Sequence, residues 1–218
     1  MRNILLALSL VTTASLAFAD DDAPAKPSVV RPAPAREFTP LMPTPDMAGW
    51  HVRKPEAKSY WRVVNGIVFN NVSTNEHGVD LVTDKKFWNF TIRYEYIVRD
   101  GSNSGLYLRG RHELQILGDF KRGKPDLHGD GSIYGIKAPD SYSTNPPGLW
   151  NTVEATIIGN KVTVFLNGIK IHDNVEVTKA TGSEIDDKVN EPGPIFLQGD
   201  HGWVAFRNLQ IRELPDGK

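Results

Sequence analysis

The sequence predicts an all-β fold, a sandwich of two sheets of antiparallel strands. From Trp50 onward, short runs alternate apolar and polar residues with a period of two, which is typical of strands with one buried face. Gly, Asn, Asp and Pro separate these runs at short intervals, as in β-sandwiches. No segment places apolar residues at helical spacing over three turns. A sandwich of this size offers one concave sheet for a ligand groove.

The individual strands follow from the alternation. In residues 90–98 the apolar side chains share one parity, whereas Arg93 and Glu95 share the other. Residues 106–117 alternate in the same way and are expected to form one strand. Residues 153–157 and 162–166 follow, and Asn167-Gly168 predicts a tight type I′ hairpin turn into residues 169–171. Two further strands, at 195–197 and 204–211, are expected to close the domain.

The N-terminal part is expected to lie outside this domain. Residues 1–19 have the features of a secretory signal: Arg2, a short apolar stretch, and an A-x-A site ending at Ala19. Residues 20–45 are rich in Pro and Ala and predict an extended tether, in which residues 38–42 form the first ordered piece. The folded domain is predicted at 46–215, in a protein that is secreted or periplasmic. No apolar stretch is long enough to span a membrane.

Composition excludes several classes of function. The chain has 218 residues, with 25 basic and 26 acidic side chains and a formal net charge of −1. This balance argues against a nucleic-acid binder, which needs a basic surplus. There is no cysteine, so disulfides, thiolate zinc sites and cysteine nucleophiles are excluded. Any divalent cation, Ca²⁺ or a transition metal, must bind to histidine, carboxylate or carbonyl groups.

The polar side of residues 106–117 is the first candidate for a site. It carries Arg109, Arg111, Glu113 and Gln115, which either face solvent or line a groove. The preceding polar turn at Asn103 and the polar parity of Glu95 on another strand favour the groove. Arg109 and Glu113 also fit a purely structural ion pair. Residues 121–147 form an irregular segment, and a loop of that length is usually functional.

Aromatic, amide and histidine side chains supply further candidates. The five tryptophans suit stacking on sugar rings, although each also fits a hydrophobic core. Asn103, Gln115, Gln198 and Arg109 suit hydrogen bonds to hydroxyl groups. The clusters at 128–130 and 200–201 suit a metal or acid–base chemistry only weakly. Among the other histidines, His112 has the parity of the interior, and three are expected at the surface: His51, His77 and His172.

Signatures of common enzymes are missing. The sequence has no Walker loop, no G-x-S-x-G and no H-E-x-x-H. It also lacks the E-x-D-x-x-E strand of laminarinase-like glycosidases, because Gln115 stands where the second carboxylate is needed. Retaining hydrolysis requires two carboxyl groups about 5–5.5 Å apart.

The order of the short motifs resembles the 3-keto-disaccharide hydrolase domain family. The resemblance extends from about Phe38 to Leu214 and is most specific at Asn103 to Gly110 and Glu113 to Leu117. The other matching pieces are Gly49 to Val52, Asn89 to Tyr96, Gly131 to Gly135, Trp150-Asn151, Leu166 to Gly168, Gly193 to Gln198 and Phe206 to Asn208. Gly118 departs from the family pattern, which often has Asp there.

The resemblance implies a concanavalin A-like jelly roll and cleavage of glycosides oxidised at C3. A C3 ketone acidifies the C2 hydrogen and makes the C1 oxygen a leaving group, so one base with electrophilic help is enough for elimination and then hydration. On this hypothesis Glu113 is the general base or a metal ligand, Arg109 stabilises the enolate, and His201 is a second acid–base or metal candidate. The remaining residues would bind the oxidised glucoside or disaccharide: Asn103, Glu95, Gln115, Tyr134 and Gln198.

Three other functions stay open. A non-catalytic, lectin-like carbohydrate-binding module shares the same expected fold. An ordinary glycosidase would use Glu95 and Glu113 as its carboxylate pair. A structural domain in an envelope assembly would use the Pro-rich segment as its linker. The sugar, the anomer, the oligomeric state, the metal requirement and the choice between lyase and hydrolase are not determined by the sequence.

Overall fold

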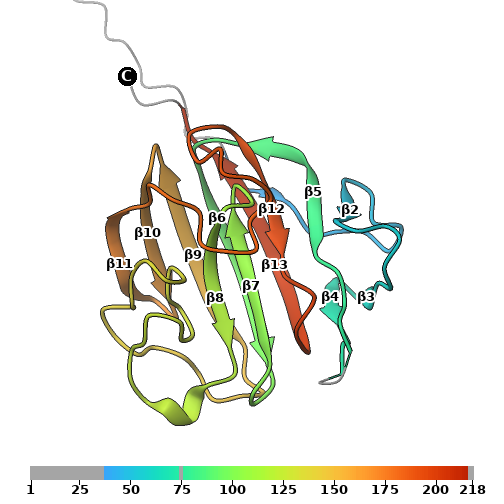
Figure 1. Cartoon of the computed structure of the whole chain (residues 1–218), viewed down its shortest axis with the longest axis horizontal. Helices are drawn as coiled ribbons and strands as arrows, with labels where there is room; N and C mark the ends of the chain where they lie inside the picture. Colours follow the sequence, from blue (N-terminus) through green and yellow to red (C-terminus); the bar gives the residue numbers. More distant parts are fainter. Residues whose placement is uncertain (1–36, 74–75, 216–218) are drawn as a thin grey trace, which may run out of the picture. The chain divides into compact units, whose positions relative to one another are not determined.

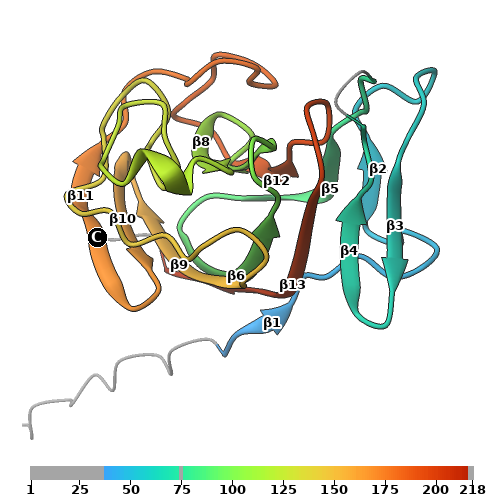
Figure 2. The same ribbon diagram turned by 90° about the horizontal axis from the view of Figure 1, so that it is seen from below.

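The computed structural model describes residues 37–73 and 76–215, and these residues form two antiparallel β-sheets. Figures 1 and 2 show the sheets as two stacked layers. The predicted all-β jelly-roll sandwich is therefore confirmed. Helical structure in the described part is limited to one turn of 3₁₀-helix, η1 (Phe120–Arg122). The predicted signal at 1–19 and most of the predicted tether lie outside the described residues.

The larger sheet has eight strands and holds both ends of the domain. Its order is β11-β10-β9-β6-β13-β4-β3, and β1 pairs with β13. The strands are β1 (Thr39–Pro40), β3 (Trp61–Val64), β4 (Ile67–Asn70), β6 (Phe90–Val98), β9 (Asn151–Ile158), β10 (Lys161–Leu166), β11 (Ile169–Glu176) and β13 (Val204–Glu213). β1 pairs with β13 through Thr39 and Pro40, which lie within the expected first ordered piece at residues 38–42.

The smaller sheet has five strands in the order β2-β5-β12-β7-β8. They are β2 (Trp50–Val52), β5 (Leu81–Phe87), β12 (Gly193–Leu197), β7 (Asn103–Leu108) and β8 (His112–Leu117). The expectation of one strand over 106–117 is wrong, because β7 and β8 are two arms of a hairpin. Arg109 and Gly110 have positive φ angles of 54° and 66° and turn the chain back on itself.

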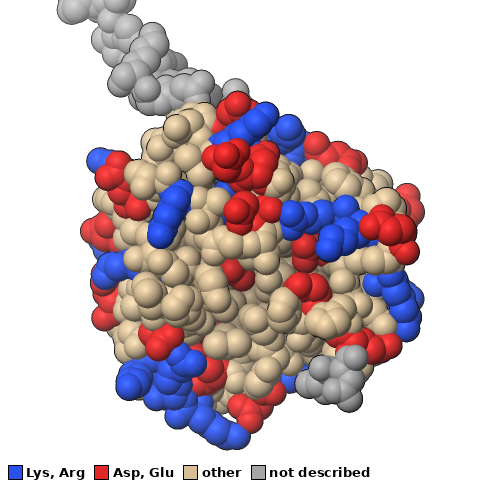
Figure 3. Space-filling view, in the orientation of Figure 1, with Lys and Arg blue, Asp and Glu red and all other residues tan. Residues whose placement is uncertain are grey.

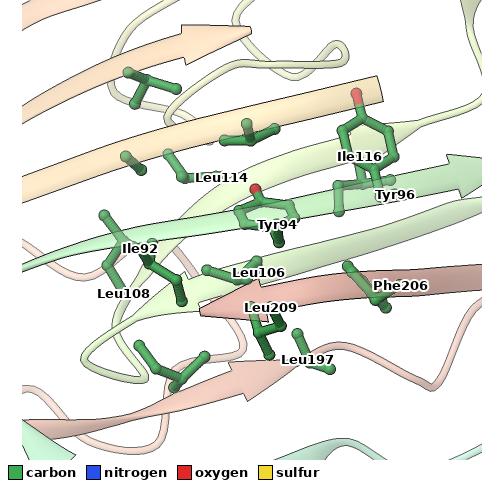
Figure 4. Packing of buried hydrophobic residues seen from close by; sticks show 14 of the residues in the cluster. Ile92, Tyr94, Tyr96, Leu106, Leu108, Leu114, Ile116, Leu197, Phe206 and Leu209 are labelled. Carbon is green, nitrogen blue, oxygen red and sulfur yellow. The ribbon is translucent and has the colours of Figure 1, made fainter. Parts of the chain in front are cut away.

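The core lies between the layers, where the apolar parities of both sheets meet (Figure 4). Tyr94 and Phe206 come from the large sheet, and Leu106 and Leu114 come from the small one. The Asn167-Gly168 turn forms as expected, with φ angles of 52° and 79° between β10 and β11. The outer face of the five-stranded sheet is thereby left to side chains of the opposite parity.

The long segment 121–147 lies along β8, the edge strand of the small sheet. Ile133 forms a β-bridge with Leu114, and the amide of Tyr134 donates to the carbonyl of Glu113 at 3.1 Å. Buried Asp130 fixes the segment by accepting hydrogen bonds from Tyr96, Thr144 and the amide of Leu117. The segment therefore forms hydrogen bonds with part of the free edge of β8, which could otherwise pair with strands of other chains.

Candidate functional site

A polar hollow of about 260 Å³ opens on the outer face of the five-stranded sheet, where β7 begins and β12 ends. Strands β7, β8 and β12 supply its floor, and segments 134, 182–183 and 201 supply its walls. Its lining residues are Asn103, Tyr107, Glu113, Gln115, Tyr134, Gly182, Ser183, Gln198 and His201. The structure thus brings together six of the eight residues proposed from the sequence.

Glu113 lies at the floor of this hollow because of the strand alternation. Its neighbour Leu114 packs into the core, so Glu113 points to the outer face. Its amide donates to Thr181 Oγ1 at 2.9 Å. A Cβ at Gly105, on the adjacent strand, would lie 2.4 Å from Glu113 Oε1. Glycine at 105 therefore makes the space that the carboxylate occupies.

The surroundings of Glu113 disfavour its charge. Its side chain is almost completely buried, and burial raises its pKa from 4.5 to about 8. A hydrogen bond with Tyr107 lowers the pKa of Glu113, while the negative charges of Asp200 and Asp80 add to the increase. None of the described residues that line the hollow is Lys or Arg. A carboxyl group with a pKa in this range can accept and donate a proton near neutral pH.

Two side-chain amides offer unused acceptors to a ligand. Asn103 Oδ1 and Gln198 Oε1 are buried and lack a hydrogen-bond partner. A ligand hydroxyl in the hollow would supply the missing donors. The amide of Gln115 is already engaged, since Nε2 donates to the carbonyl of His128 at 3.3 Å and Oε1 accepts from the amide of Ile116 at 3.0 Å. Asn103 and Gln198 are therefore the stronger candidates for binding hydroxyl groups.

His201 and Tyr134 stand at the walls. His201 is exposed, and its Nδ1 bonds to the carboxylate of Asp200. This contact fixes the orientation of the imidazole ring at the wall of the hollow. Tyr134 is partly buried, and its ring packs edge-on against His128 with the ring centres 4.8 Å apart.

Arg109 is placed elsewhere. It belongs to the β7–β8 turn, where Nε donates to the carbonyl of Trp88 at 2.8 Å and Nη2 to that of Gly159 at 2.7 Å. Its guanidinium lies 3.5 Å from the centre of the Trp88 ring. Strand parity does not continue through a turn, so Arg109 does not share a face with Glu113. Arg111 is likewise diverted, to the carboxylate of Asp186.

Glu95 is also outside the hollow. It lies on β6 of the other sheet and lines a separate depression of about 450 Å³. Its Oε2 accepts from Arg207 Nε and Nη2 at 2.8 and 2.7 Å, and its Oε1 accepts from Asn208. Partial burial raises the pKa of Glu95, but these hydrogen bonds outweigh burial and lower it. Glu95 and Glu113 therefore do not form the carboxylate pair of an ordinary glycosidase.

The tryptophans do not line this hollow. Trp50 and Trp61 are buried and donate from their indole nitrogens to the carbonyls of Leu41 and Val79. The other three are each covered by an arginine: Trp88 by Arg109, Trp150 by Arg207 and Trp203 by Arg99. The aromatic rings at the hollow are instead those of Tyr107 and Tyr134.

The histidines and acidic residues give no metal centre in residues 37–73 and 76–215, where no three His, Asp or Glu side chains cluster suitably. His51 and His77 are exposed and His112 is buried, as expected. His172 is not at the surface; it is buried and its Nε2 bonds to the carbonyl of Gly131 at 2.8 Å. Within the same described part, no helix is long and apolar enough to span a membrane.

Three lining residues were missed from the sequence: Tyr107, Gly182 and Ser183. Tyr107 alternates with Leu106 and Leu108, so its parity already placed it on the outer face. Gly182 and Ser183 belong to a segment without periodicity, and no local signal indicated that it crosses the sheet.

Several solved structures share this architecture. A candidate glycosyl hydrolase from Parabacteroides distasonis is 27% identical with a TM-score of 0.66, and the match covers 81% of this chain and 84% of that one. A second from that organism is 24% identical with a TM-score of 0.62, covering 82% and 100%. A carbohydrate-binding module from Bacillus subtilis is 11% identical with a TM-score of 0.52, covering 76% and 96%. The last two show the fold alone.

The jelly-roll fold, the family match over most of the chain and the 27% identical candidate glycosyl hydrolase together indicate a carbohydrate-active protein. The sequence matches the 3-keto-alpha-glucoside-1,2-lyase-like domain over residues 37–212. The chain therefore belongs to the 3-keto-disaccharide hydrolase domain family, as its motifs indicated. No curated protein matches the sequence.

Proposed function

We propose that the protein cleaves glycosides that carry a ketone at C3, by elimination across C1 and C2. The observation that carries the proposal is Glu113. Among the described residues of the hollow it is the only carboxylate, and burial raises its pKa to about 8. Hydrolysis through a glycosyl-enzyme intermediate needs a second carboxyl group about 5–5.5 Å away. Elimination needs only one base.

The ionised Glu113 takes the C2 proton, and the electron pair of that bond moves toward the C3 oxygen as an enolate. The enolate collapses to a C1–C2 double bond with the C3 ketone restored, and the C1–oxygen bond breaks. A proton passes to the departing oxygen, and His201 at the wall of the hollow is the candidate donor. Water then adds its oxygen to C1 and gives up a proton to the group that protonated the departing oxygen, while the Glu113 proton returns to C2. These transfers complete a net hydrolysis and restore both groups.

The remaining lining residues hold the sugar. Asn103 and Gln198 have unpartnered carbonyl oxygens that accept hydrogen bonds from sugar hydroxyls. Tyr134 offers an aromatic wall and a hydroxyl. The Tyr107 hydroxyl lies between Glu113 and the carbonyl of Gly182, to which it donates at 3.0 Å. This contact keeps the carboxyl group oriented while its charge changes.

The test compares methyl 3-keto-α-glucoside with unoxidised methyl α-glucoside, each with and without a chelator. We expect methanol from the ketone only, together with either an unsaturated ketone or 3-ketoglucose, which separates lyase from hydrolase. Release from the unoxidised glucoside instead would identify an ordinary glycosidase. Saturable binding without any product would identify a carbohydrate-binding module. Loss of turnover with the chelator would add a metal requirement.

We also propose that the activity is exported. Residues 1–19 have the charge, the apolar stretch and the A-x-A site of a secretory signal. Mass spectrometry of the protein recovered outside the cytoplasm should give an N-terminus at Asp20. An intact Met1 on that protein would contradict the proposal.

A further inference from the structure

The outer face of the five-stranded sheet is crossed by one segment, residues 181–186, here called the strap. It follows β11 in the chain and runs over the sheet before β12 begins (Figure 1). On the β8 side, the amides of Thr181 and Ile185 donate to the carbonyls of Arg111 and Gly110, both at 3.0 Å. These bonds fix one side of the strap to the β7–β8 turn.

A single arginine fixes the other side. Arg53 follows β2, and its Nη1 and Nη2 donate to the carbonyls of Ser183 and Glu184, both at 2.6 Å. Between the two sides, Ile185 packs on Val82, Tyr107 and Phe196. The Tyr107 and Phe196 rings stack with their centres 4.0 Å apart, so the strap rests on a firm apolar base.

The strap divides the face into two hollows. The first is the hollow of about 260 Å³ that contains Glu113, and Gly182 and Ser183 form part of its wall. The second, of about 350 Å³, lies toward β2 and β5, and Arg53 and Ile185 form part of its wall. Figure 3 shows this face with Lys and Arg toward its rim and a mostly uncharged centre. Pockets for small-molecule ligands usually occupy roughly 300–1,000 Å³, so the first hollow alone is small even by that measure.

We infer that the strap restricts the Glu113 hollow to one sugar ring, and that Arg53 is the positioning residue that holds the strap closed. The inference rests on the proposed carbohydrate site. A glycan chain cannot continue across the sheet into the second hollow while Arg53 holds Ser183 and Glu184 in place. Releasing the strap would join the hollows into one groove, in which further sugar rings gain contacts.

The experiment measures affinity against chain length by calorimetry. The probes are methyl α-glucoside and maltotetraose, each also in the form oxidised at C3 of the non-reducing ring. The oxidised probes are measured in the Glu113→Gln background, which prevents turnover. For protein that keeps Arg53, we expect the affinities for the short probe and the long probe to differ by less than about threefold. For Arg53→Ala, we expect maltotetraose to bind about tenfold more tightly than methyl α-glucoside.

Lys54→Ala, an exposed neighbouring change, is the matched control and should keep the flat dependence on length. Arg53→Lys keeps the charge but cannot bridge two carbonyls, so it should give an intermediate ratio. Hydrogen exchange at the amides of Thr181 and Ile185 shows whether the strap has opened. Ile185→Ser is a second route to opening it if Arg53→Ala does not fold.

Two results would overturn the inference. One is a tenfold preference for maltotetraose with the strap intact. The other is affinity that stays independent of glycan length in the variants. This result counts against the inference whether hydrogen exchange shows that the strap has opened or is unchanged in every variant. If the wild-type protein cleaves no ketone but the length effect appears, only the proposed reaction fails. If cleavage stands without the length effect, only the strap fails, and absence of any glycan binding removes both.

Discussion

The outer faces of the two sheets each contain a hollow with a glutamate, but the two glutamates are in opposite chemical states. Glu95, on the eight-stranded sheet, is neutralised by Arg207 and also bonds to Asn208. Glu113, on the five-stranded sheet, has Tyr107 as its hydrogen-bond partner and acidic Asp200 and Asp80 nearby. The hollow around Glu95 is the larger, at about 450 against 260 Å³. The better candidate for proton transfer is therefore Glu113, whose carboxyl group has no cationic partner among the described residues, although its hollow is the smaller of the two.

The largest expected effect comes from exchanging each glutamate for its amide. Glu113→Gln should lower kcat on methyl 3-keto-α-glucoside by at least about a thousandfold, because the amide cannot accept the C2 proton. Glu95→Gln is the matched control on the other sheet and should change kcat by less than about threefold. Steady-state kinetics on both variants, with circular dichroism to verify folding, checks the comparison. Equal losses in both variants would contradict it.

A smaller loss is expected from Gly105→Ala. The added Cβ would meet Glu113 Oε1 at 2.4 Å and must displace the carboxyl group. A misplacement of about 1 Å typically costs up to about a hundredfold in rate, so we expect a fall in kcat of about 10- to 100-fold. Full activity would mean that Glu113 need not occupy the position described. Calorimetry serves as the control, because it shows whether the variant is still folded at the assay temperature.

The pH dependence separates the two glutamates further. If Glu113 acts as the base, kcat/KM should rise about tenfold per pH unit as the pH approaches its pKa of about 8 from below. The reason is that the reactive form is the ionised one, which burial makes scarce at lower pH. The profile is measured on the ketone substrate in buffers of constant ionic strength. An inflection near pH 4–5 would assign the base to an ordinary exposed carboxylate.

The smallest effect is on stability, and its sign differs between the sheets. The pKa of Glu113 is raised, so the folded protein keeps a proton that the unfolded chain releases between pH 4.5 and about 8, and stability is lost as pH rises through that window. Glu113→Gln removes this cost and should raise Tm at pH 8 by about 2–8 °C, or roughly 1–2 kcal/mol, with little change at pH 4.5.

Glu95→Gln should act in the opposite direction. The pKa of Glu95 is lowered, so its contribution is present at neutral pH and is lost as pH falls. The variant should lower Tm at pH 8 slightly, by no more than about 1 kcal/mol for a partly exposed ion pair. Scanning calorimetry at pH 4.5 and pH 8 tests both variants. The same sign in both at pH 8 would refute the contrast.

The sequence predicts the sandwich and most of this site because strand alternation is a local property. The parity of Leu114 and Ile116 places Glu113 and Gln115 outward without any knowledge of the fold. Asn103, Tyr134, Gln198 and His201 come from separate segments, and only the resemblance to a family could bring them together. The confirmed fold then unites them in one hollow.

The errors arise where local patterns stop. Arg109 was assigned to a strand face because alternation was continued across what proves to be a turn with positive φ angles. Glu95 has the correct parity for an outer face, but parity does not say which sheet a strand joins. The strap has no periodic pattern that would predict its place. Its position depends on hydrogen bonds from Arg53, about 130 residues earlier in the chain.

The bridge between Ile133 and Leu114 has a consequence for how this family can vary. The segment that covers the free edge of β8 is the same one that places Tyr134 at the wall of the hollow. A deletion in it would expose strand backbone to other chains and remove a binding residue together. Shortening this segment would therefore change the hollow and at the same time raise the risk of aggregation. Point changes within the segment would alter the hollow and leave the edge of β8 covered.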